Sequence, residues 1–135
     1  MDKALNYLAI ARKAGLAELG EEPVGAVTRA GKGYLVAVAF DASDHTWRRA
    51  KSFVAGTEQQ CVRLPYSKDE MGMAVGRSSL AIAAVPDAAL ALALVKSLPD
   101  GDAAAEEALS RRTEKLNQRK KEARAHQRNL RKGKK

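Results

Sequence analysis

One unbroken apolar segment constrains the fold more than any other feature. Every side chain from residue 34 to residue 40 is apolar, so the segment cannot alternate between a solvent-facing and a core-facing side as a half-exposed strand does. We therefore expect a β-strand that is buried on both faces. Ser43 follows closely and is a good N-cap for a helix running to about Gly56. Strand, short turn and capped helix make half of a βαβ unit, which favours an α/β fold.

The same order of strand and capped helix occurs twice more. Residues 61–64 are an expected strand, and the Ser67-Lys68-Asp69-Glu70 capping box after it begins a helix that runs to Gly76. Residues 80–85 are a third apolar strand, after which Asp87 caps a helix rich in alanine and leucine that ends at Leu98.

Two helices precede these units. Residues 2–14 carry apolar side chains at helical spacing, and a second helix is expected from Gly20 to Gly31, with Pro23 tolerated in its first turn. Gly25 inside that helix is unfavourable by about 1 kcal/mol relative to alanine. Together the elements predict an α/β fold, a three-layer α/β/α sandwich with a mixed, largely buried central sheet and a C-terminal basic helical extension.

The chain divides by charge as well as by pattern. We expect one folded domain over residues 1–98 and a basic tail, helical or disordered, over residues 99–135, with the turn at 99–102 as the boundary. Residues 1–110 hold 12 basic and 14 acidic side chains, whereas residues 111–135 hold 12 basic and 2 acidic ones. Such a run of cations repels itself unless an anionic partner neutralises it, and nucleic acid is the partner that we favour over an acidic membrane surface.

The apolar residues of the tail are too sparse for a coiled coil. Leu109, Leu116, Ala123 and Leu130 fall seven residues apart, which gives one apolar position per heptad where a coiled-coil seam needs two. We expect a solvated, frayed helix that becomes ordered on its partner.

Several classes of function are disfavoured by what the sequence lacks. Cys61 is the only cysteine, so an internal disulfide or a cysteine-based zinc site is excluded within one chain. No phosphate-binding Gly-x-x-x-x-Gly-Lys motif and no acid–base or nucleophile constellation is present. We therefore expect no enzyme activity, metal, cofactor or small-molecule substrate, and no association with a membrane. Without a signal sequence or an apolar run of spanning length, a cytoplasmic protein is expected.

The ordered set of motifs resembles a known family. The stretches are Gly20-Glu21-Glu22-Pro23-Val24, Arg29-Ala30-Gly31-Lys32, the buried strand, Asp41-Ala42-Ser43, residues 66–72 and Val75-Gly76-Arg77. Over about residues 4–98 they are similar to the kink-turn RNA-binding ribosomal-protein family of large-subunit protein seven-Ae, and most like its bacterial YlxQ-type members. The resemblance implies an α/β/α sandwich that grips a sharply bent RNA without catalysis.

The resemblance also implies where RNA would bind. Family members hold RNA at the start of the second helix, through a Gly-x-Asn-Glu-x-x-Lys motif, and at the loop entering the last strand. Here Gly20 keeps the glycine, but Glu22, Pro23 and Ala26 occupy the asparagine, glutamate and lysine positions. The implied RNA-binding residues of the body are Gly20, Glu21, Glu22, Val24, Arg29, Lys32, Lys68, Arg77, Ser78, Ser79 and Leu80. In the tail, charge alone points to Arg111, Arg112, Lys115, Arg119, Lys120, Arg124 and Arg128.

Two functional hypotheses follow. The first is a non-enzymatic, ribosomal-type protein that binds structured, kink-turn-like or ribosomal RNA through the start of its second helix and its basic tail. The second is a ribosome-associated adaptor whose body contacts protein while the tail binds RNA without sequence preference. Trp47 is expected to pack against the edge of the domain, with stacking on a base as the less favoured alternative.

Overall fold

The computed structural model describes the backbone of residues 2–133 and the side chains of residues 2–127. Its centre is a four-stranded mixed sheet, made of β1 (Glu18–Leu19), β2 (Leu35–Ala39), β3 (Gln60–Leu64) and β4 (Ile82–Val85). The strand order is β1-β4-β2-β3. β2 and β3 run parallel, as a βαβ unit requires, and β4 lies antiparallel between β2 and β1.

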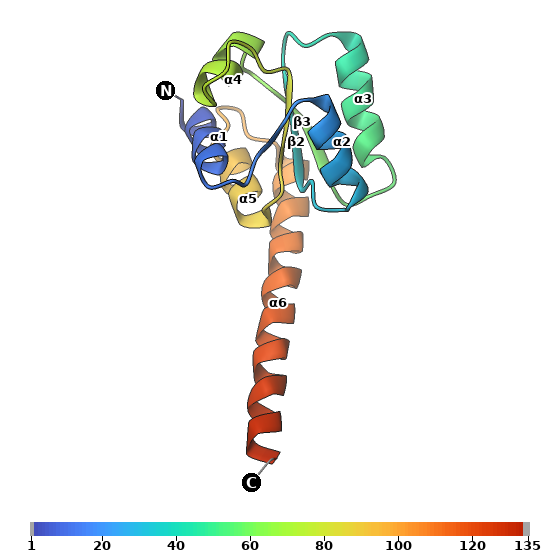
Figure 1. Ribbon diagram of the computed structural model, residues 1–135, viewed down its shortest axis with the longest axis vertical. Helices are drawn as coiled ribbons and strands as arrows, with labels where there is room; N and C mark the ends of the chain where they lie inside the picture. The colour runs from blue at the N-terminus through green and yellow to red at the C-terminus, as the bar shows by residue number, and fades with distance from the viewer. Residues whose placement is uncertain (1, 134–135) are drawn as a thin grey trace.

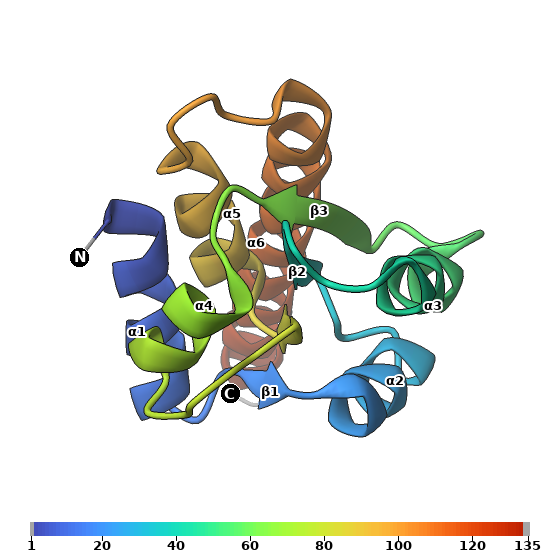
Figure 2. The same cartoon turned by 90° about the horizontal axis from the view of Figure 1, so that it is seen from above.

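Helices cover both faces of this sheet (Figure 2). One face carries α1 (Lys3–Lys13), α4 (Lys68–Ala74) and α5 (Ala88–Lys96), and the other carries α2 (Glu21–Arg29) and α3 (Asp44–Val54). The sixth helix, α6 (Ala103–Gly133), contacts α5 and β3 where it begins. The predicted α/β/α sandwich with a C-terminal helical extension is confirmed.

The central strand and the helix caps follow the sequence pattern closely. All five residues of β2 are buried. Ser43 accepts a hydrogen bond from the amide of Thr46, Asp87 accepts one from Leu90, and the Ser67 capping box is complete. The expectation that the buried strand includes Phe40 is wrong. The strand ends at Ala39, and the Phe40 side chain is 53% exposed.

Gly25 is explained by close packing between α2 and α3. A Cβ atom at this position would lie 3.3 Å from two ring carbons of Phe53 on α3. The absence of a side chain therefore lets the two helices approach, and that packing offsets the low helix propensity of glycine. The helix predicted from Gly20 to Gly31 is present, with Gly20 as its N-cap.

The first turns of α6 belong to the body of the protein. Ala105 and Leu109 are 3% and 1% exposed and lie within the hydrophobic core. Asp102 begins the helix by accepting a hydrogen bond from the amide of Ala105. The core therefore extends past residue 98, where we place the end of the domain from the sequence, and includes about the first two turns of α6.

Beyond these turns, α6 leaves the body as a single straight helix (Figure 1). Its 31 residues correspond to a length of about 46 Å at 1.5 Å per residue. Every side chain from residue 117 to residue 127 is exposed. We call residues 117–133 the arm. Within residues 2–133, no helix has both the length and the apolar character needed to cross a membrane.

Candidate nucleic-acid interface

Three helices begin along one edge of the sheet. The strands β1, β2 and β3 all end there and lead into α2, α3 and α4, and β4 starts from the same edge. We call this the upper edge: the first turns of α2, α3 and α4, residues 40–43 and the α4–β4 loop, residues 75–81. Neighbouring strands lie about 4.8 Å apart, so the four strand ends span about 14 Å. The arm points away from the opposite end of the body (Figure 1).

The structure brings most of the predicted body residues together at the upper edge. Backbone hydrogen bonds join its parts, from the Gly20 amide to the Ile82 carbonyl (3.0 Å) and from the Leu80 amide to the Lys68 carbonyl (2.9 Å). Residues gathered there with at least part of their surface open are Gly20, Glu21, Glu22, Lys68, Arg77, Ser78 and Ser79.

Four predicted residues have different positions. The side chains of Val24 and Leu80 are 0% and 3% exposed, so they support the edge from inside the core and have no surface to offer to RNA. Lys32 lies beyond the last turn of α2, at the end farthest from Gly20. Arg29 is in that last turn, but it shares a face of the helix with Gly25 and Glu21.

The backbone amides at the start of α2 form a smaller anion site than the sequence suggests. The Gly20 amide donates to Ile82, the Val24 amide donates to the Gly20 carbonyl, and Pro23 has no amide hydrogen. Within residues 20–24 this leaves the amides of Glu21 and Glu22 directed out of the helix. A phosphate placed here receives two donors next to two carboxylates, which weakens the attraction of the helix N-terminus.

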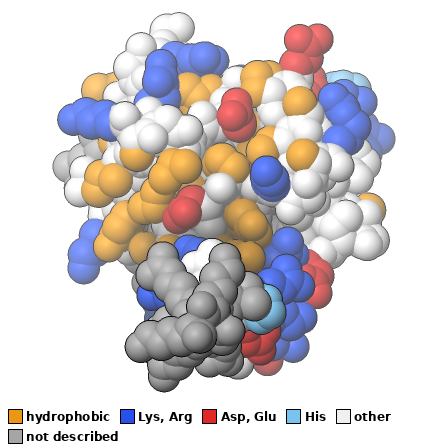
Figure 3. Space-filling view, turned by 60° about the horizontal axis from the view of Figure 1, so that its bottom comes forward, with side chains coloured by type: hydrophobic (Ala, Val, Ile, Leu, Met, Phe, Trp, Pro, Cys, Tyr) orange, Lys and Arg blue, Asp and Glu red, His pale blue; other side chains and the backbone are white. Residues whose placement is uncertain are grey.

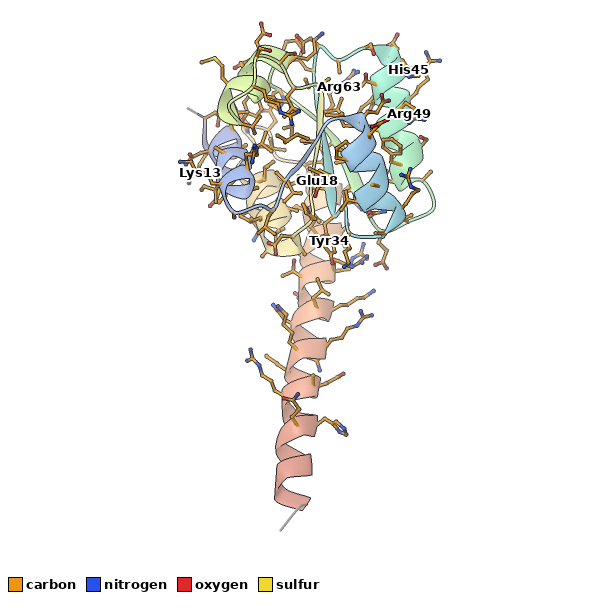
Figure 4. The ribbon with its side chains drawn as sticks, viewed as in Figure 1. Lys13, Glu18, Tyr34, His45, Arg49 and Arg63 are labelled. Carbon is orange, nitrogen blue, oxygen red and sulfur yellow. The ribbon has the colours of Figure 1, made fainter. Side chains whose placement is uncertain are left out.

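An arginine from α3 partly compensates for those carboxylates. The Arg49 Nε atom donates to Glu21 Oε1 at 3.0 Å, and His45 Nε2 lies 4.0 Å from the same oxygen. Figure 4 shows His45 and Arg49 on α3 at the side that faces α2. The two helices enclose a hollow of about 370 Å³ that is lined by Glu21, Glu22, Gly25, Arg29 and Arg49. Arg49 adds a positive charge to this hollow, and the sequence did not identify it as a site residue.

The upper edge as a whole is not basic. Its helix starts and loops carry the carboxylates of Glu21, Glu22, Asp41, Asp44, Asp69 and Glu70, against the cations of Lys68 and Arg77. Three of the acids are engaged, because Glu21 accepts from Arg49, Asp41 from the Lys68 amide and Glu70 from the Ser67 amide. Phe40 adds an exposed aromatic ring. An RNA placed at this edge would meet shape and an aromatic ring more than positive charge.

Gly72 holds the α4–β4 loop in place. A Cβ atom at Gly72 would lie 2.7 Å from the Ser79 nitrogen and 2.8 Å from the Arg77 oxygen, both backbone atoms. We expect Gly72→Ala to displace the loop and to lower the free energy of unfolding by about 1–3 kcal/mol, as measured by urea denaturation. Met73→Ala is the control, because Met73 is 77% exposed and should change stability by less than about 0.5 kcal/mol. Equal effects of the two substitutions would contradict this role of Gly72.

A second set of polar contacts fixes the base of α6. Glu58, in the loop before β3, accepts from Arg112 Nη1 at 2.7 Å and lies 3.6 Å from Lys115 Nζ. The Arg112 guanidinium also lies over the Tyr34 ring, 5.1 Å from its centroid, and Figure 4 shows Tyr34 where α6 leaves the body. Arg112 and Lys115, which we assigned to RNA binding from the sequence, therefore fix the direction in which α6 leaves the body. Figure 3 shows basic side chains on α6 and, next to them, hydrophobic side chains on the surface of the body.

The charges of Lys115 and Arg112 lower the pKa of the Glu58 carboxyl below its ordinary value of 4.5. A depressed folded-state pKa means that Glu58 stabilises the folded protein above pH 4.5, and that this contribution is lost as the pH falls through the folded-state pKa. We therefore expect Glu58→Gln to destabilise the protein at pH 7 and to make no difference at pH 2, as measured by urea unfolding. Glu114→Gln, an exposed position on α6, should have no such pH-dependent effect.

The remaining predicted cations of the tail are open to solvent. Arg111, Arg119, Lys120 and Arg124 are exposed, as is Lys121. Arg128 lies in α6, but its side chain is outside the described residues. Glu122 is the one acid between residues 117 and 127, and it accepts a hydrogen bond from Gln118 at 3.3 Å. This segment therefore concentrates free positive charge.

Trp47 packs against the domain as expected. It is half-buried, with Arg63 Cζ at 4.7 Å and Lys51 Nζ at 5.5 Å from its ring centroid. Cys61 lies on the neighbouring strand β3, where burial raises the pKa of its thiol to about 11. The thiol is therefore protonated at neutral pH and unreactive.

Two solved structures are similar to the chain. A protein of unknown function from Bacillus halodurans C superposes with a TM-score of 0.66 at 24% identity, over 71% of this chain and 96% of that one. The Giardia lamblia 15.5kD RNA binding protein superposes with a TM-score of 0.55 at 21% identity, over 79% of this chain and 87% of that one. The chain shares their fold. No protein-family profile and no curated protein matches its sequence.

Proposed function

We propose that this is a non-enzymatic RNA-binding protein of the kink-turn, ribosomal type, in which α6 supplies most of the affinity and the upper edge supplies the preference for bent RNA. The observation that carries the proposal is the projecting basic arm, whose cations between residues 117 and 127 face solvent rather than acidic partners of the body. Counterion release from RNA phosphates is the source of binding free energy that such an arrangement provides.

The upper edge supports the second part of the proposal through its composition and position. Gly20, Arg77, Ser78 and Ser79 meet at the ends of adjacent strands, as the family resemblance implies. Phe40 offers a flat apolar ring on which an unpaired base can stack. The fold is also that of the Giardia lamblia RNA binding protein.

The proposal requires two separate contacts on the RNA. The upper edge and the arm lie at opposite ends of the molecule (Figure 1), so the arm cannot hold the phosphates next to the nucleotides at the edge. A ribosomal RNA, with many helices close together, offers both contacts at once.

A second function is favoured by the acidic character of the upper edge. In this alternative, the body binds a protein on the ribosome through its carboxylates and Phe40, while the arm binds RNA without preference. Arg49 engaging Glu21 fits this alternative too, because it fixes a carboxylate in position.

The two functions are separated by comparing two RNAs over a salt series. We would measure binding of the full chain, and of the K68Q/R77Q and F40A variants, to an internal-loop RNA that forms a kink and to a plain duplex of equal length. The proposed function predicts a preference for the kinked RNA that the variants lose while duplex binding stays. Equal binding of both RNAs by the wild type would support the adaptor, and no binding of either RNA would exclude both functions.

A further inference from the structure

The described cations of the arm cover more than half of the circumference of the helix. Arg119, Lys120 and Lys121 are consecutive and all exposed. Successive residues of an α-helix are rotated by about 100°, so Arg119 and Lys121 point about 200° apart, toward nearly opposite sides. Arg124 returns to within about 40° of Lys120 by the same geometry. Together these cations span about 200° of the circumference, and Glu122 lies in the remaining arc.

Between residues 117 and 127, the arm has no apolar face to place against a membrane or a partner helix. Leu116 and Ala123 are seven residues apart, and every residue between them is polar or charged. A helix that lies in a membrane interface needs a broad apolar stripe opposite its charges, and a coiled coil needs two apolar positions per heptad. The distribution of side chains disfavours both kinds of partner.

The body holds this segment clear of itself. Leu109 is buried in the core, Arg112 and Lys115 engage Glu58, and all side chains of residues 117–127 are exposed. Contacts at the base thus fix the direction of α6 while leaving its whole circumference open over the next three turns (Figure 1).

From this geometry we propose that the arm inserts between two phosphate-lined walls of a folded RNA, as in a groove or in the crevice where two RNA helices meet. The inference rests on the proposed function and specifies how the RNA is bound. A single anionic surface neutralises the cations of one side and leaves those of the opposite side unpaired. Walls on both sides neutralise Arg119 and Lys121 together, and an α-helix about 10–12 Å across fits between them.

The test measures how many arm cations contact phosphates. Each phosphate contact contributes about 0.7–0.9 to the slope of log affinity against log salt concentration. We would determine this slope for the full-length wild type and for R119Q, K121Q and the double variant, with a three-way-junction RNA as the probe. Both single variants are expected to lower the slope by about 0.7–0.9, and the double variant by about 1.4–1.8.

Two controls make the outcomes distinct. Lys13→Gln, an exposed position on α1, should leave the slope unchanged, and circular dichroism should show the same helix content in every variant. A slope that falls in only one of R119Q and K121Q would mean one-sided binding and would overturn this inference while leaving the proposed function intact. If the wild type does not bind the RNA, the proposed function fails, and this inference fails with it.

Discussion

Neutralising the four exposed cations of the arm, in the variant R119Q/K120Q/K121Q/R124Q, should weaken RNA binding by about 10³-fold near 0.1 M salt. Each phosphate contact contributes about 0.7–0.9 to the slope of log affinity against log salt concentration. The loss of four contacts therefore removes about three logarithmic units of affinity over a tenfold change in salt concentration. All four side chains are exposed and contact no part of the body, so the fold should be unaffected. Fluorescence anisotropy with a labelled RNA measures the affinity, and thermal denaturation checks the fold.

A matched control removes the same net charge from the body. Lys3, Arg12, Lys13 and Lys96 are exposed on α1 and α5, and their replacement by glutamine should weaken binding by less than about tenfold, because these residues act only at long range. If both quadruple variants lose the same affinity, net charge rather than the arm determines binding, and the proposed role of α6 is wrong.

Leu109→Ala should lower the free energy of unfolding by about 2–5 kcal/mol, the range for large-to-small substitutions at buried leucines. Leu109 is 1% exposed and lies in the core, although it belongs to a helix whose later turns extend into solvent. The expected effect means that α6 folds together with the body. Urea denaturation followed by circular dichroism gives the value.

Leu116→Ala is the comparison for that variant. Leu116 lies seven residues further along the same helix, with a half-exposed side chain, and its truncation should cost less than about 1 kcal/mol. A small effect of Leu109→Ala, similar to that of Leu116→Ala, would show that the base of α6 detaches readily. The domain would then end near residue 98, as the turn at residues 99–102 predicts.

Local signals in the sequence were sufficient for β2, β3 and β4, for the caps and for the fold class. Ser43, Ser67 and Asp87 cap the helices as predicted because a cap depends on residues within one turn. β2 was recognisable because a strand buried on both faces leaves no alternation of polar and apolar residues. Most of the exposed site residues at the upper edge were named through the family resemblance and not through local pattern.

Long-range pairing was beyond such local signals. β1 has two residues, too few for any pattern, and forms because β4 provides a partner. The contact between Arg112 and Glu58 joins residues 54 positions apart, and the one between Arg49 and Glu21 joins residues 28 apart. Burial of Leu109 likewise depends on where α6 starts on the sheet. The sequence alone thus assigned Arg112 to RNA, whereas the structure uses it to orient the helix.

The placement of acids at the upper edge and of cations on the arm gives the molecule a permanent electric dipole along its long axis (Figure 1). The field of a polyanion exerts a torque on such a dipole at distances where no atoms touch. Under the proposed function, the protein would therefore approach RNA with its helical end leading and its carboxylates trailing. Productive encounters become more frequent than random tumbling allows, and added salt removes this advantage before it breaks any contact.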